Sequence, residues 1–169
     1  MGDVIDILED LIEKINKKAP SSTCLASSLR QIEKHQMGFN GEHIGQSTLK
    51  KMKYKGVKTT RHKDPFDIIT GNTAWEVKTL SHEAKHIQMS VKPAQKASKL
   101  AWAEANNKRV KSMLVIVNDG KAEIFVKDGL GKFRPGGMKK VRTITDWRNE
   151  VGYGRSTQPS LLRESIEPK

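Results

Sequence analysis

The segment from Phe66 to Thr79, which reads FDIITGNTAWEVKT, constrains the fold more than any other part of this chain. Two runs rich in β-branched and aromatic residues flank Gly71-Asn72, a pattern typical of antiparallel strands joined by a tight turn. With a two-residue turn, the expected pairs across the strands are Thr70 with Thr73, Ile68 with Trp75, and Asp67 with Glu76. The segment therefore predicts a β-hairpin with a defined register.

This register sorts the side chains of the hairpin, because successive residues of a strand point to opposite faces. The apolar face is expected to hold Phe66, Ile68, Trp75 and Val77, and the other face Asp67, Glu76 and Lys78. Two carboxylates directly opposite each other, with Cβ atoms about 4.5–5.5 Å apart, destabilise a strand pair. A divalent cation between them would explain the pattern, and a solvated surface with salt bridges is the alternative.

Composition narrows the class of protein and its partners. The 169 residues are enough for one domain with a hydrophobic core. Lysine and arginine total 31 against 19 acidic residues, a net charge of +12 that predicts a polyanionic partner: DNA, RNA or an anionic membrane surface. The single cysteine, Cys24, excludes an internal disulfide and a cysteine-rich zinc site. With no membrane span and no signal peptide in the pattern, we expect a cytoplasmic protein without a membrane partner.

Periodicity and turn residues divide the chain into three regions. We expect a helical segment packed on the core (1–37), a core domain (38–151) and a flexible C-terminal tail (152–169). Helices are expected at 3–17, 22–36, 42–54, 93–107 and 146–151, with a break at 38–41. Strands are expected near 57–60, in the hairpin, and at 87–91, 112–117 and 122–127, followed by a glycine-rich loop at 129–137.

This order of elements predicts an α/β (α+β) fold. A mixed central β-sheet would carry the charged residues on its antiparallel hairpin, and helices would flank the sheet. The continuous apolar run from Ser112 to Val117 indicates a strand buried on both faces.

Asp67, followed after eight residues by Glu76-Val77-Lys78, resembles the D…(D/E)xK signature of the PD-(D/E)XK nucleases. The resemblance covers residues 38–127, where a helix with an acid, a strand ending in Asp, a strand with ExK and a further helix follow in the family's order. It implies a restriction-endonuclease-like core, similar to small phage-type or resolvase-like members, in a bacterial or phage-infected host cell. The proline–aspartate pair is not intact, since Pro65 precedes Phe66. Asp64 is an alternative acid, which the register places on the face opposite Glu76.

The resemblance implies a metal-dependent endonuclease or exonuclease that hydrolyses DNA phosphodiester bonds. Its catalytic residues would be Asp67, Glu76, Lys78 and Glu42. The carboxylates of Asp67 and Glu76 and the Val77 carbonyl would hold Mg²⁺, for which Mn²⁺ would substitute. Lys78 would orient or deprotonate a metal-bound water. Glu42 would bind the metal through water or supply a second site.

Contacts to nucleic acid are expected from a basic run without an acid and from the helix after the hairpin. The residues are Lys50, Lys51, Lys53, Lys55, Lys58, Arg61 and Lys63, with Gln95 and Lys99 on the helix. Such a run would follow a phosphate backbone independently of sequence. DNA is the expected substrate, RNA stays open, and a homodimer formed through the first helix is a hypothesis.

Two other functions compete with this interpretation. His82-Glu83-Ala84-Lys85-His86 fits the HExxH pattern of zinc metallopeptidases, which needs both histidines on one helix. The strands expected on either side leave barely one turn for that helix. The second alternative is a nuclease-like domain that binds nucleic acid without cutting it.

Overall fold

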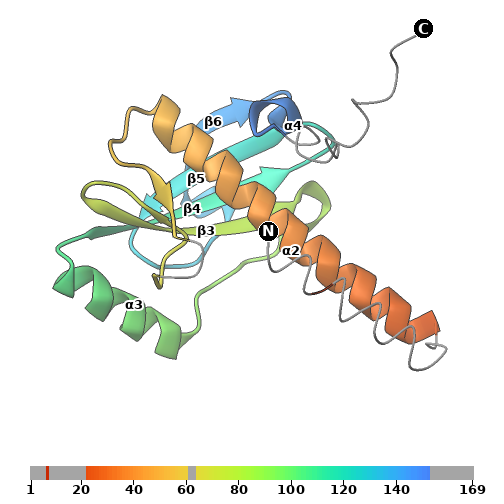
Figure 1. Cartoon of the computed structure of the whole chain (residues 1–169), viewed down its shortest axis with the longest axis horizontal. Helices are drawn as coiled ribbons and strands as arrows, with labels where there is room; N and C mark the ends of the chain where they lie inside the picture. The colour runs from red at the N-terminus through yellow and green to blue at the C-terminus, as the bar shows by residue number, and fades with distance from the viewer. Residues whose placement is uncertain (1–6, 8–21, 61–63, 153–169) are drawn as a thin grey trace, which may run out of the picture. The chain divides into compact units, whose positions relative to one another are not determined.

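The computed structural model of this chain describes residue 7, residues 22–60 and residues 64–152 (Figure 1). The chain divides into two units, residues 1–40 and 41–169, and all of the sheet belongs to the second unit. The helix expected at 3–17 and the tail beyond 152 lie outside the described residues, apart from residue 7, which is helical. The packing of the first segment on the core stays a prediction.

Six strands form one mixed sheet in the order β1-β2-β3-β4-β5-β6. β3 and β4 run parallel, with α3 between them in the chain, and every other neighbouring pair is antiparallel. The elements are α2 (Ser22–Lys51), β1 (Lys58–Thr59), β2 (Ile68–Ile69), β3 (Thr73–Ser81), η1 (His82–Ala84), α3 (Pro93–Ala105), β4 (Arg109–Val117), β5 (Ala122–Asp128), η2 (Pro135–Gly137), β6 (Lys139–Ile144) and α4 (Trp147–Glu150). The predicted mixed α/β sheet flanked by helices is confirmed.

Each face of the sheet has its own hydrophobic core. On one face, Ile44 and Leu49 of α2 pack with Trp75 and Val77 of β3. On the other face, Ala103 of α3 packs with a group that includes Ala74, Leu80, Leu114 and Phe125. The middle of β4 is buried from Ser112 to Ile116, as the apolar run predicts. Because residues alternate along β3, the side chains of Glu76 and Lys78 lie on the α3 face.

The hairpin has the predicted register but a shorter first strand. Ile68 pairs with Trp75, and the Thr70 N–H donates to the Thr73 carbonyl at 2.8 Å. The N–H of Asp67 also donates to the Trp75 carbonyl, at 3.1 Å, so two residues oppose one, as in a β-bulge. The extra residue turns Phe66 to the α3 face, and its expected place beside Ile68 is therefore wrong.

α2 is continuous, so the predicted break at 38–41 and the extension to residue 54 are wrong. The glycines of this region reflect close packing on the sheet. A Cβ at Gly41 would lie 1.8 Å from Thr79 Oγ1, and one at Gly45 would lie 2.9 Å from Met113 Sδ. Glycine is therefore required here by the distance between helix and sheet and not by a turn.

Two further predictions about strands are corrected. Residues 87–91 do not form a strand, because only Met89 pairs, in an isolated bridge with Phe133. The edge strand β6 was not predicted, since its sequence KKVRTI is mostly polar and its outermost position leaves much of it exposed. α4 matches the expected short helix, and its Asp146 side chain accepts the Asn149 N–H as an N-cap. No helix in the described ranges is long and apolar enough to cross a membrane.

Candidate functional site

One pocket of about 280 Å³ in the second unit gathers residues that the sequence singled out from four separate segments. Its predicted members are Glu42, Asp67, Glu76, Lys78, Gln95 and Lys99, and Thr60, Asp64, Pro65 and Phe66 complete the lining. At the β-bulge, Asp67 lies next to β3. Gln95 and Lys99 of α3 line the pocket over the face of the sheet that carries Glu76. The pocket therefore contains every predicted catalytic residue.

Glu76 is the central side chain of the pocket and is almost completely buried, with 2% of its surface exposed. Its two oxygens have different partners. Lys78 Nζ lies 2.7 Å from Oε1, and Lys99 Nζ lies 2.6 Å from Oε2. The alternative of a solvated strand face is therefore wrong for Glu76, which is a buried carboxylate held by two lysines.

Asp67 lies beside Glu76 but does not face it across a regular ladder, because strand pairing ends at Ile68. Its Oδ2 accepts the Val77 N–H at 2.7 Å. Burial and then the negative charge of Glu76 raise the pKa of Asp67, and these effects outweigh the Val77 hydrogen bond and the charges of Lys78 and Lys99. A carboxylate whose pKa is raised by burial and a like charge, in a pocket, is typical of functional sites.

Lys99 connects α3 to the hairpin. Besides Glu76, its ammonium donates to the Pro65 carbonyl and lies 5.0 Å from the centre of the Phe66 ring. The sequence predicts Lys99 only as a nucleic-acid contact. Its contact with Glu76 spans 23 residues of sequence, and no local pattern in the chain indicates it.

Thr60 and Asp64 also belong to the pocket. Thr60 Oγ1 donates to the Phe66 carbonyl at 2.5 Å, which ties the end of the β1 segment to the bulge. Thr60 was not predicted. Asp64 was expected on the opposite face from Glu76, but it is an exposed member of the same lining. Asp64 and Pro65 precede β2 in a bend, so the alternation of a strand does not apply to them.

The donors in the pocket fit a hard divalent ion of the magnesium type. Among the described residues, no three His, Cys, Asp or Glu side chains converge as a ready-made metal cage. Mg²⁺ does not need one, since it usually keeps several waters and takes one or two carboxylates. Asp67 and Glu76 are such a pair. In a strand, the N–H and the carbonyl of one residue point to the same side. Asp67 accepts the Val77 N–H, so the Val77 carbonyl also points to the side of β3 on which Asp67 lies.

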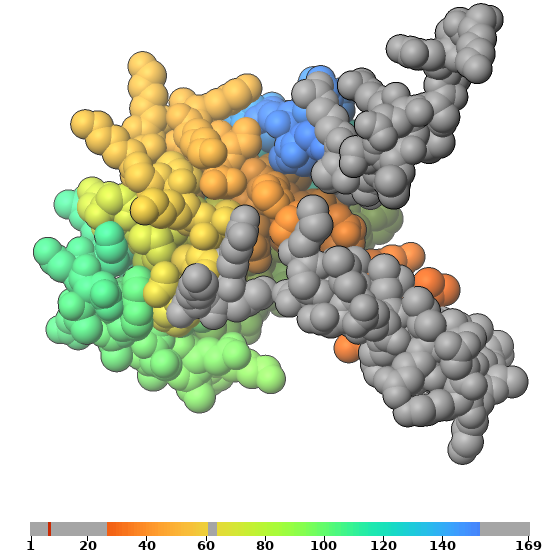
Figure 2. Space-filling model, viewed as in Figure 1, coloured from red at the N-terminus to blue at the C-terminus, as the bar shows by residue number. Residues whose placement is uncertain are grey.

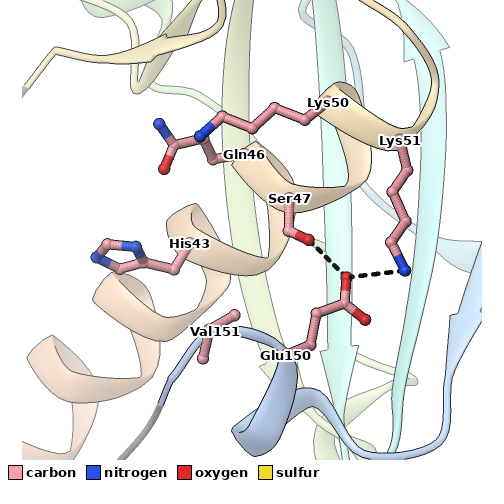
Figure 3. Close-up of a pocket in the computed structure, with 7 residues that line it drawn as sticks. All are labelled: His43, Gln46, Ser47, Lys50, Lys51, Glu150 and Val151. Atoms are coloured by element: carbon pink, nitrogen blue, oxygen red, sulfur yellow. Dashed lines mark hydrogen bonds and ion pairs between the residues drawn. The ribbon is translucent and has the colours of Figure 1, made fainter. Parts of the chain in front are cut away.

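Most of the basic run lies away from this pocket. The side chains of residues 50–58 are largely exposed, and the segment after α2 (gold) projects from the surface in Figure 2. Lys50 and Lys51 line a different pocket of about 480 Å³, where Ser47 and Lys51 point towards Glu150 (Figure 3). The lining of the Glu76 pocket does not include Lys53, Lys55 or Lys58. Arg61 and Lys63 lie outside the described residues.

The HExxH segment does not have the geometry of a zinc site. Residues His82–Ala84 form a short 3₁₀ helix with no buried residue. His82 Nε2 lies 3.2 Å from Lys85 Nζ, and no α-helix places the two histidines on consecutive turns. Comparisons of the chain with protein-family models, with curated proteins and with solved structures found no match.

Proposed function

We propose that this protein is a Mg²⁺-dependent deoxyribonuclease with a core of the PD-(D/E)XK type. The observation that carries the proposal is the pair of adjacent carboxylates, the half-buried Asp67 and the buried Glu76, in one pocket with Lys78. Burial of two like charges is unfavourable unless cations compensate them. A pocket that keeps such a pair is better explained by metal and phosphate chemistry than by a contribution to stability.

Each residue has a role that follows from its contacts. Asp67, Glu76 and the Val77 carbonyl would hold Mg²⁺, which supplies Lewis-acid activation of water and phosphate when bound. Lys78 is half-buried, with its ammonium at the Glu76 carboxylate, so it is placed to orient the attacking water and to stabilise negative charge on the phosphate. Lys99 positions Glu76 from α3, and Glu42 faces the pocket from α2.

The runner-up is a domain that binds nucleic acid without cutting it. Its specific support is that Lys78 and Lys99 both form ion pairs with Glu76, so cations of the chain itself offset the charge of this carboxylate. The two functions differ in what Mg²⁺ does. A nuclease needs the metal for turnover, whereas a binding domain keeps its affinity for DNA when the metal is removed.

The test is cleavage of supercoiled plasmid with Mg²⁺, with Mn²⁺ and with EDTA. We expect cleavage with either metal and none in EDTA. Glu76→Gln, Asp67→Asn and Lys78→Met should each reduce the rate by about 10²-fold or more, as expected for loss of a metal ligand or a proton-transfer group. Glu104→Gln is the matched control, because Glu104 is an exposed acid on α3 outside the pocket.

Cleavage that persists in EDTA, or that Glu76→Gln leaves unchanged, would contradict the proposal. Thermal unfolding gives a second readout. At ten times its dissociation constant, Mg²⁺ should stabilise the wild-type protein by about 1.4 kcal/mol. This stabilisation should be lost in Glu76→Gln and retained in Glu104→Gln. Tight DNA binding without cleavage, in either metal, would favour the runner-up.

A further inference from the structure

A second group of cations lies on the α3 face of the sheet, next to the pocket. It consists of Lys96 on α3, Lys127 on β5 and Arg134 in the loop before η2, and is called the Lys127 cluster below. Burial, and then the positive charges of Arg134 and Lys96, lower the pKa of Lys127. Arg134 and Lys96 therefore lie close enough for their charges to act on Lys127, and both are exposed.

Strand register places this cluster relative to the pocket. Glu76 pairs with Ser112, and Ser112 pairs with Lys127, so the three side chains share one face of the sheet. Strands are spaced about 4.8 Å apart, so two spacings put Lys127 roughly 10 Å from Glu76 along the row. One turn of α3 joins the two sites, because Gln95 and Lys99 line the pocket while Lys96 belongs to the cluster.

The cluster is held by the fold. The Lys127 ammonium donates to the Lys132 carbonyl and lies 6.0 Å from the centre of the Phe133 ring. Phe133 is fully buried, and its backbone exchanges hydrogen bonds with Met89 at 2.8 and 3.2 Å. This bridge fixes the loop that carries Arg134 close to the start of α3.

The arrangement opposes stability in two ways. Like charges repel, and the first turn of α3 has no acidic residue, while Lys92 is its N-cap residue. The helix dipole favours acids at that end, so the chain places cations where the helix itself is positive. A bound polyanion reverses both effects.

We propose that the Lys127 cluster binds the phosphate backbone of a nucleic-acid strand whose scissile phosphate occupies the Glu76 pocket. The proposal deepens the proposed function and rests on it, since it assigns the path of the substrate. From the pocket, the strand crosses the first turns of α3 to reach Lys96, Arg134 and Lys127. Contacts of this kind recognise phosphate charge and not base sequence.

The experiment measures binding of the full chain to a fluorescent DNA duplex by anisotropy, in EDTA and over a range of NaCl concentrations. The test variant is the triple Lys96→Ala, Lys127→Ala, Arg134→Ala. The control is the triple Lys121→Ala, Lys139→Ala, Arg148→Ala, which removes the same charge from exposed residues outside the cluster and the pocket. Because Lys127 is partly buried, the double variant Lys96→Ala, Arg134→Ala repeats the test with exposed residues only.

We expect the cluster triple to weaken binding by more than tenfold at low salt. The slope of log affinity against log salt should fall by about 2–3, at roughly 0.9 per lost phosphate contact. For the double variant this slope should fall by about 2, and for the control triple it should equal the wild-type slope. Equal losses in the two triples would show that only net charge matters and would overturn the proposal. Loss of binding to anionic phospholipid vesicles, with DNA binding intact, would overturn it as well.

Cleavage assays on the same variants separate this inference from the proposed function. If the wild-type protein cleaves DNA and the cluster triple keeps the wild-type salt slope, the inference fails while the nuclease function stands. If the wild-type protein does not cleave but the cluster triple loses slope, the nuclease function fails and the phosphate-binding cluster stands.

Discussion

At the scale of single residues, Asp67 is a group whose surroundings oppose its charge. Burial and the neighbouring Glu76 raise its pKa, and the Val77 N–H and the two lysines compensate only in part. Natural proteins commonly keep such unfavourable groups where function needs them, at the cost of stability. Asp67 should therefore show a trade-off between stability and metal binding.

We predict that Asp67→Asn stabilises the metal-free protein at neutral pH. The folded-state pKa of Asp67 is raised above 3.8, so its favourable contribution is present below that pH and is lost as the pH rises through the folded pKa. Asparagine removes the charge but keeps an oxygen for the Val77 N–H. Urea unfolding should show a gain of about 0.5–2 kcal/mol at neutral pH that shrinks towards about pH 4.

The control for this prediction is Glu104→Gln, whose exposed side chain should change stability by less than about 0.5 kcal/mol at either pH. A less stable Asp67→Asn protein at neutral pH would show that the Asp67 charge is fully compensated by its surroundings. That result would remove one support of the metal site.

At the scale of elements, the hairpin and α2 show where local patterns succeed and fail. The Gly-Asn turn and the β-branched strands make the register of Ile68 with Trp75 predictable, because it depends on neighbouring residues alone. The bulge at Asp67 depends on Thr60 and on β3. From the sequence alone, the glycines at 38 and 41 predict a break in the helix. In the structure, Gly41 and Gly45 fill the narrow space between helix and sheet.

We predict opposite effects for two glycine substitutions in α2. Gly41→Ala should destabilise the protein by about 1–3 kcal/mol, because the new Cβ would lie 1.8 Å from Thr79 Oγ1 and 2.9 Å from Thr79 Cβ. Gly38→Ala should stabilise it by about 0.5–1 kcal/mol, since nothing lies within 4 Å of its Cβ position and alanine favours the helix. Thermal unfolding measures both. Destabilisation by Gly38→Ala would indicate that α2 is interrupted there after all.

At the scale of the whole molecule, an ion-pair network joins segments that are distant in sequence. Glu150 of α4 accepts hydrogen bonds from Ser47 of α2 at 2.5 Å and from Arg142 of β6 at 2.8 Å. Burial raises the pKa of Glu150, but the hydrogen bonds and the charges of Arg142 and Lys51 lower it more, and the net pKa is below its ordinary value of 4.5. This network fixes the last helix of the described chain against α2 and the edge strand, as Figure 3 shows in part.

We predict that Glu150→Gln destabilises the protein by about 1–3 kcal/mol at neutral pH, as expected for losing hydrogen bonds to a charged group. Because the folded-state pKa is lowered, the stabilisation is present above pH 4.5 and is lost as the pH falls through the folded value. The difference between variant and wild type should therefore narrow in acid, as for Asp67→Asn, but Glu150→Gln is the less stable protein at neutral pH, whereas Asp67→Asn is the more stable one. Asp119→Asn is the control, since its pair with Arg148 is exposed and should contribute less than about 0.5 kcal/mol. A destabilisation that does not change with pH would refute the electrostatic origin.

The sequence by itself determined the local features: the hairpin register, the strand that is buried from Ser112 to Ile116, the helix beginning at Pro93, and the types of residue in the candidate site. These depend on periodicity and turn chemistry within a few residues. Only the tertiary structure decided that Glu76 is buried and held by Lys99, that Phe66 faces α3, and that Lys127 joins Lys96 and Arg134. The physical reason is that the burial and the pairing of a charge depend on segments that meet in space. The residues next to that charge in the sequence do not indicate which segments these are.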